Sequence, residues 1–122
     1  MAANKIEKFG PVALTTTLTT NILNPAAAGA GTGYTPTASY IILRHIRIVN
    51  KTGSAATFSL WLGLTGANTA GTEVIGQATS VAANTSFDWY GMLILKAADF
   101  LVGGAGTATA LTFEGEGEVG LV

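Results

Sequence analysis

The chain contains no cysteine, and only one of its 122 residues is a histidine. Without cysteine there are no disulfides, thiolate metal ligands or cysteine nucleophiles, so stability has to come from packing and strand pairing. Charge is also scarce, because 11% of the residues are charged where about 25% is usual for a soluble domain. The net charge of −1 lacks the basic surplus that neutralises phosphates, so we expect no nucleic-acid partner.

Long apolar runs are absent as well. No stretch approaches the roughly 18 apolar residues that a membrane-spanning helix requires. The first nine residues alternate charged with apolar side chains and lack the apolar core and cleavage site of a signal peptide. The sequence therefore predicts no membrane partner and no secretion.

Short segments rich in β-branched and aromatic residues follow one another, separated by turns rich in Gly, Ala and Thr. Their spacing of roughly 8 to 12 residues, without a helical period, is typical of an antiparallel sandwich or barrel. We predict an all-β fold, a single antiparallel β-sandwich, jelly-roll or Ig-like, of about 7–8 short strands over residues 11–122. The expected strands are residues 12–24 (one or two strands), 40–50, 57–65, 73–78, 87–95, 100–102 and 107–113. The turn at residues 50–53 predicts that the second and third of these segments form a hairpin.

Residues 1–10 are interpreted as an N-terminal arm ahead of the sandwich. They mix charged residues with two large apolar ones, Ile6 and Phe9, and end at Gly10-Pro11, which is typical of a boundary. We expect the arm to become ordered only against a neighbouring subunit, with Ile6 and Phe9 as interaction residues.

Three side chains are candidates for catalysis. A nucleophilic triad needs a base, and the single histidine, His45, lies within the strongest strand segment, where a structural role is the commoner one. Asp88 and Asp99 flank the aromatic strand and would be a carboxylate pair if they converged. Asp99, in Ala-Ala-Asp-Phe, is instead typical of a turn residue that accepts backbone N–H groups. The sequence predicts no catalytic residue and no enzyme, with a small hydrolase built on these three residues as a rival hypothesis.

Glu114, Glu116 and Glu118 alternate with glycines near the end of the chain. In an extended strand the three carboxylates share one face and stand about 6 to 7 Å apart, too far to share one small ion comfortably. We therefore predict a solvated or partner-facing acidic strip with no metal and no cofactor.

The apolar content indicates an assembly. Residues 40–49 and 87–95 carry apolar side chains on both strand faces, whereas a two-layer sandwich buries one face of each sheet. The loops are short of large side chains, so a neighbouring subunit is the expected cover. The sequence predicts a homo-oligomer, a trimer or other cyclic assembly, with an interface above about 1,000 Å².

The stretch from residue 40 to residue 119 resembles small β-sandwich virion proteins of tailed bacteriophages. The resemblance rests on a strand pattern, a small-residue connection, an apolar strand, an aromatic strand, an Ala-Asp turn and a closing Glu-Gly. In this chain the strand pattern is Ile46-Arg47-Ile48-Val49-Asn50, the connection is residues 51–56, and the apolar strand is residues 58–64. The aromatic strand contains Leu93-Ile94-Leu95, the turn is Ala98-Asp99, and the closing pair is Glu114-Gly115. Ala98 stands where the pattern has a glycine.

This resemblance implies a non-enzymatic protein located in the virion and repeated on its surface. Its expected partners are itself and other virion proteins such as the major capsid protein, and a head decoration (cement) protein fits the minimal single domain best. A neck or collar component and a tail accessory protein stay open. A carbohydrate-binding module is a further alternative, because Trp61, Trp89 and Tyr90 would stack on sugar rings if they were exposed.

Overall fold

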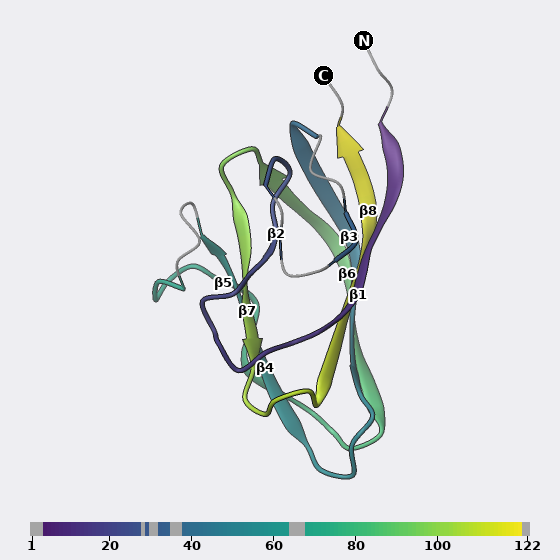
Figure 1. Ribbon diagram of the computed structural model, residues 1–122, viewed down its shortest axis with the longest axis vertical. Coiled ribbons are helices and arrows are strands. Elements are labelled where there is room, and N and C mark those ends of the chain that lie inside the picture. Colours follow the sequence, from purple (N-terminus) through teal and green to yellow (C-terminus); the bar gives the residue numbers. More distant parts are fainter. Residues whose placement is uncertain (1–3, 28, 30–31, 35–37, 64–67, 121–122) are drawn as a thin grey trace.

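The computed structural model describes residues 4–27, 29, 32–34, 38–63 and 68–120, and this part of the chain is built from strands without a helix (Figure 1). The strands are β1 (Lys5–Ala13), β2 (Asn21–Leu23), β3 (Tyr40–Asn50), β4 (Ala56–Gly63), β5 (Glu73–Val81), β6 (Thr85–Lys96), β7 (Phe100–Ala105) and β8 (Leu111–Gly120). The predicted all-β class is confirmed.

Two four-stranded antiparallel sheets form a sandwich. The first sheet has the strand order β1-β8-β3-β6, and the second sheet has the order β2-β7-β4-β5. Strand pairing is nested, since β1 pairs with β8, β2 with β7, β3 with β6 and β4 with β5. Nested pairing of eight strands across two sheets is the jelly-roll arrangement, which decides between the two predicted forms of the sandwich.

The core lies between the sheets and is formed by alternate residues of the long strands. β3 contributes Ile41, Leu43, Ile46 and Ile48, all fully buried. The period of two breaks at Arg44, where the register shifts against both neighbouring strands. A bulge of this kind keeps apolar side chains inward on both sides of the extra residue.

The N-terminal arm is a correction to the sequence-based prediction. Residues 5–13 form β1, an edge strand paired with β8 from Lys5 opposite Val119 to Ala13 opposite Thr112. Phe9 is completely buried and packs edge-on against Tyr34, with ring centroids 5.3 Å apart. The charged residues of this segment concealed a strand, because an edge strand of one sheet tolerates charge on its exposed side.

Gly10 explains why a strand continues through a Gly-Pro pair. Its φ is +100°, and a Cβ there would lie 2.8 Å from the carbonyl oxygen of Phe113. The register of β1 against β8 shifts between Phe9 and Val12, so this glycine allows a bulge where other residues would be strained.

The predicted hairpin after β3 is also wrong. β3 and β4 belong to different sheets, and the turn at Asn50 carries the chain from one layer to the other. Asn50 is buried, and its side-chain amide donates to the carbonyl oxygens of Ser54 and Val81 at 2.9 and 3.0 Å. These bonds fix the crossing.

Near the end of the chain the predicted boundaries differ from those of the structure. β7 continues through Gly103 and Gly104, which were expected in a loop, and β8 begins at Leu111, four residues after the expected start. Small side chains in β7 are required because neighbouring backbone approaches closely: a Cβ on Gly103 would meet the carbonyl oxygen of Ser59, and one on Gly104 would meet that of Thr15.

The outer face of the second sheet is covered around β7 by the segment between β1 and β2. A Cβ on Gly104 would meet the carbonyl oxygens of Thr15 and Thr17, which places this segment over the outward side of β7. The N–H of Ala105 donates to Thr15 O at 2.8 Å, and the N–H of Gly103 donates to Thr20 O at 3.0 Å. The chain thus supplies part of its own second cover.

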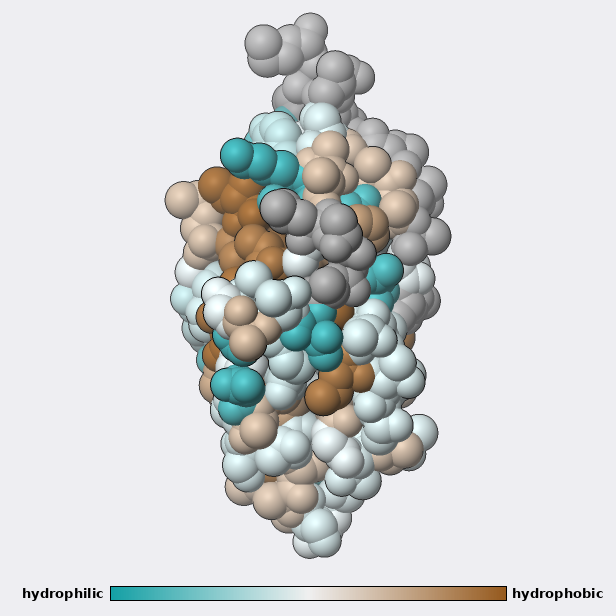
Figure 2. All heavy atoms as spheres, turned by 90° about the vertical axis from the view of Figure 1, so that its left-hand side faces the viewer, coloured by the Kyte–Doolittle hydropathy of each residue, from teal (hydrophilic) through white to brown (hydrophobic). Residues whose placement is uncertain are grey.

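Trp61 and Val102 are buried on this outer side of the second sheet. They are cross-strand partners in β4 and β7, only 5% and 0% of their surface is exposed, and neither belongs to the cluster between the sheets. Figure 2 faces the side of the molecule on which the second sheet lies in Figure 1, and apolar atoms reach the surface there in separate areas among hydrophilic ones.

Candidate functional site

The three glutamates of β8 share the outer face of the first sheet, as the sequence predicts. Gly115 and Gly117 alternate with them and face the buried side. Glu116 is exposed, and Glu114 and Glu118 are half-buried. Because β8 is a central strand, the acidic strip lies in the middle of the sheet, with β3 on one side and β1 on the other.

Strand register brings basic residues beside these glutamates. On β3, Arg47 is directly opposite Glu114, and His45 is directly opposite Glu116. On the other side of β3, Asp88 of β6 is opposite Arg47, and Tyr90 of β6 is opposite His45. We call seven of the ionisable side chains on this face the polar cluster: Arg44, His45, Arg47, Asp88, Glu114, Glu116 and Glu118. Lys8 of β1 lies opposite Glu116 on the same face.

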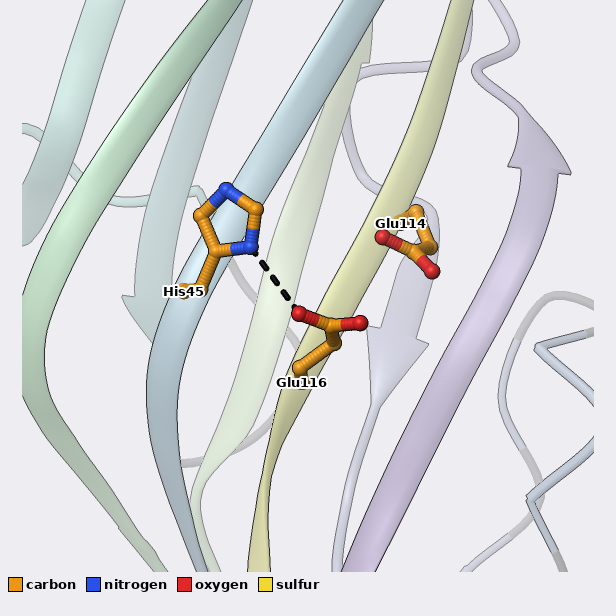
Figure 3. A group of neighbouring side chains, drawn as sticks. All are labelled: His45, Glu114 and Glu116. Carbon is orange, nitrogen blue, oxygen red and sulfur yellow. Dashed lines mark hydrogen bonds and ion pairs between the residues drawn. The ribbon is translucent and has the colours of Figure 1, made fainter.

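His45 is held between two carboxylates. Its Nε2 lies 2.8 Å from Asp88 Oδ1. Its Nδ1 lies 3.1 Å from Glu116 Oε1 (Figure 3). The ring stacks on Tyr90 with centroids 4.5 Å apart and planes 8° from parallel. Only 16% of the imidazole is exposed, so contacts on three sides fix its orientation.

Two arginines complete the cluster. Arg47 Nε donates to Asp88 Oδ1 at 2.7 Å, and Arg44 donates from Nε and Nη2 to Glu118 Oε2 at 3.3 and 3.1 Å. Among the described residues, Glu114 and Glu116 form no ion pair with lysine or arginine. The acidic strip is therefore neutralised unevenly.

Ionisation of the cluster follows from these contacts. The hydrogen bond that His45 donates to Asp88 raises the pKa of His45, partial burial opposes the rise, and the hydrogen bond to Glu116 adds to it. The hydrogen bonds from Arg47 and then from His45 lower the pKa of Asp88, and the pKa of Arg47 is raised by the same pair. These shifts keep Asp88 ionised and favour imidazolium at His45.

The three catalytic candidates do not form a catalytic site among the described residues. Both ring nitrogens of His45 contact carboxylates, so neither contacts a hydroxyl. Asp99 lies in the turn after β6, where its carboxylate accepts the N–H of Lys96 at 2.9 Å, which confirms the turn interpretation. Asp88 is eight residues along β6 from Lys96, roughly 25 Å away at strand spacing, so the two aspartates cannot act together.

The predicted interaction residues of the N-terminal segment have opposite fates. Phe9 is buried in the core and is unavailable to a partner, which corrects that prediction. Ile6 is 90% exposed and faces outward beside Glu118. The other large apolar side chains exposed on the first sheet are on β6, at the opposite edge, and are Tyr90, Met92 and Ile94.

The aromatic residues considered for sugar binding do not form an exposed platform. Trp61 is buried, and Trp89 is half-buried and packs against the core. Tyr90 is 71% exposed, but one face of its ring is covered by His45.

A group of potential metal ligands was missed by sequence reasoning. The ligand atoms of His45, Glu114 and Glu116 lie within 4.8 Å of one another. The prediction of no metal assumed that the carboxylates stand about 6 to 7 Å apart along one strand, but the donor oxygens of Glu114 and Glu116 lie within 4.8 Å of each other. Finding His45 between them required the pairing of β3 with β8, about 70 residues apart in sequence and set by the jelly-roll topology.

An open depression adjoins the polar cluster at the end of β3 and β6. It is lined by Arg47, Val49, Asn50, Lys51, Asn84, Thr85 and Ser86. Both ionisable side chains of its lining are cationic.

No protein-family model matches the chain, and neither a curated protein nor a solved structure is significantly similar to it. Within the described ranges, no helix is long and apolar enough to cross a membrane.

Proposed function

We propose that this protein is a non-enzymatic structural component of a bacteriophage particle and acts as a decoration protein on the head. The observation that carries the proposal is the outer face of the first sheet. It presents Ile6 on one edge strand and Tyr90 and Ile94 on the other, with paired charges between them.

Such a face suits association with a protein surface. Exposed apolar groups of this size contribute to binding when a partner covers them. The intervening charges are mostly paired within the chain, so covering them costs less than burying free ions. Association through this face also fits the low charge content of the sequence.

Two further points support a virion role. Jelly rolls are a common architecture of viral capsid domains, and the sequence resembles small virion proteins of tailed bacteriophages. The resemblance covers residues 40–119, which span β3 to β8 and therefore most of both sheets. Fold alone does not specify function, so the surface carries the argument.

Particles of the bacteriophage that encodes the chain provide the test. Particles assembled with and without the gene are compared by protein mass spectrometry, electron microscopy and survival on heating. We expect many copies on the head surface of the complete particle, and heads that lose DNA at lower temperature when the gene is deleted. Absence of the protein from purified particles would refute the proposal.

The same experiment separates the alternatives. Density at the portal vertex, with tails failing to attach in its absence, would assign a neck or collar role. Density along the tail would assign an accessory role there. Binding of the purified chain to glycans, abolished by Tyr90→Ala, would instead support a carbohydrate-binding module.

A further inference from the structure

His45, Glu114 and Glu116 form a group on the outer face of the first sheet whose donor atoms converge from two neighbouring strands. His45 projects from β3, and the two glutamates project from β8 (Figure 3). We propose that these three side chains bind one Zn²⁺ ion. This site goes beyond the proposed structural function and does not depend on it.

The setting of His45 is that of a metal-ligating histidine. Such residues generally donate one ring N–H to a carboxylate, which fixes the ring and directs the other nitrogen at the ion. Oδ1 of Asp88 accepts a hydrogen bond from His45 Nε2 at 2.8 Å and a second one from Arg47 Nε at 2.7 Å. Nδ1 is thereby directed at the glutamates of β8, and Tyr90 holds the ring plane.

The arginine side chains pair with two of the carboxylates and leave Glu114 and Glu116 for a metal ion to bind. Of the four carboxylates in the polar cluster, Asp88 is paired with Arg47, and Glu118 is paired with Arg44. Glu114 and Glu116 have no such partner among the described residues, although Arg47 and Lys8 are opposite them in register. Within the described residues Glu116 pairs only with the imidazole of His45, and a ligating Nδ1 carries no proton, so with an ion bound both carboxylates supply the charge that a divalent ion requires.

The distances are compatible with coordination. In a tetrahedral site with metal–ligand bonds of about 2.0 to 2.2 Å, neighbouring ligand atoms are roughly 3.3 Å apart. His45 Nδ1 and Glu116 Oε1 are already 3.1 Å apart, and all three donor atoms lie within 4.8 Å. A side-chain rotation of half-buried Glu114 closes the remaining gap, and water fills the open position.

The donor set favours zinc over the hard cations. One imidazole and two carboxylates suit Zn²⁺, whereas Ca²⁺ takes six to eight oxygen ligands and Mg²⁺ a near-ideal octahedron, about twice the number of protein ligands present. No cysteine competes for the metal, and His45 is the only imidazole of the chain. Binding that involves an imidazole therefore reports on this residue alone.

Tag-free protein stripped with a chelator is titrated with Zn²⁺ by calorimetry, and the ring nitrogens of the single histidine are followed by ¹⁵N NMR. We expect one equivalent to bind, with the Nδ1 resonance shifting and Nε2 remaining protonated. His45→Gln should abolish binding, and Glu114→Gln and Glu116→Gln should each weaken it at least tenfold.

The matched control is Glu118→Gln, the same substitution on the same face of the same strand but at a glutamate paired with Arg44. Its zinc affinity should stay within about threefold of the parent protein, and circular dichroism should confirm that all four variants are folded. The proposal is overturned if no zinc binds or if His45→Gln binds zinc as the parent protein does. It is also overturned if Glu118→Gln weakens zinc binding as much as Glu114→Gln and Glu116→Gln do.

Thermal unfolding gives a second readout. An ion held by β3 and β8 binds the folded state only, so excess Zn²⁺ should raise the Tm of the parent protein and leave that of His45→Gln unchanged. Excess Ca²⁺ and Mg²⁺ should raise neither. An equal rise in both proteins would contradict coordination by His45.

Discussion

The outer faces of the two sheets differ in what covers them. On the second sheet, residues 15–18 of the chain lie over β7, and Trp61 and Val102 are buried beneath their own chain. On the first sheet, the described chain leaves Ile6, Tyr90 and Ile94 exposed, and ion pairs occupy the space between them.

This difference refines the interpretation of the apolar composition. The sequence suggested that the small-residue loops could not provide all of the cover for a second apolar face, so a neighbouring subunit was the expected cover. The segment before β2 does provide cover, because the Gly-rich β7 lets its backbone approach closely. The partner that we propose is therefore expected to bind the first sheet.

The largest expected loss of stability comes from truncating a side chain on the covered face of the second sheet. Trp61→Ala removes a buried indole from the second sheet, and we expect it to destabilise the fold by about 3–5 kcal/mol in urea denaturation. Tyr90→Ala on the open face is the matched aromatic control and should cost no more than about 1.5 kcal/mol, mainly its contact with His45. Equal losses would mean that the two faces are not differently covered.

Gly104→Ala tests the covering segment itself. The added methyl group meets the carbonyl oxygens of Thr15 and Thr17, so we expect a loss of about 1–3 kcal/mol and faster proteolysis within residues 14–20. Gly53→Ala is the control, because nothing lies near its Cβ, and its stability should change by less than about 0.5 kcal/mol. If the two variants are equally stable, the segment does not seal β7.

The open face should affect association more than folding. The double variant Ile6→Ser, Ile94→Ser removes two exposed side chains from opposite edges, so the free energy of unfolding of the isolated chain should change by less than about 1 kcal/mol. We expect the same variant to lose self-association in light scattering and binding to gene-deleted particles. Val74→Ser, on the second sheet, should retain both properties. Retained association in the double variant would show that contact occurs elsewhere.

The smallest effect is that of pH on the polar cluster, measured in the presence of a chelator. His45, which faces Asp88, Tyr90 and Glu116 and lies next to Arg47, has a raised pKa when folded, so the folded state binds more protons than the unfolded state above pH 6.5. Its contribution to stability is complete below that pH and is lost as pH rises through the folded pKa. Denaturation midpoints should fall across this window, and His45→Gln should flatten the slope. If the denaturation midpoint of His45→Gln falls with pH as steeply as that of the parent protein, another ionisable group causes the effect.

Strand bounds were predicted most accurately where β-branched and apolar residues form a dense run. The bounds of β3 were predicted correctly because eleven residues from Tyr40 to Asn50 contain a dense run of β-branched and apolar side chains. It was wrong at β1, where charge and Gly10 concealed an edge strand, and at β7, where glycines serve close packing. Local composition does not report what a distant segment will lie against.

The candidate site shows the same limit. The alternation of Glu114, Glu116 and Glu118 with glycine correctly placed the carboxylates on one face. Their partners Arg44 and His45 are about 70 residues away, and only the order of strands in the first sheet brings them together. A sandwich of the Ig type, left open by the sequence, would have given these glutamates different neighbours.

The nested pairing of the strands has a consequence for how the chain folds. Among the strands that the structure describes, β4 and β5 are the only consecutive ones that pair with each other, so their hairpin requires the shortest loop closure. The other pairs enclose progressively longer stretches, and the entropy of loop closure delays them, which places this topology among slow folders. On the ribosome, β1 emerges first but pairs only with β8, which emerges last. Until β8 has been made, β1 has no native partner, so its backbone edge is unpaired and Phe9 is exposed in the newly made chain.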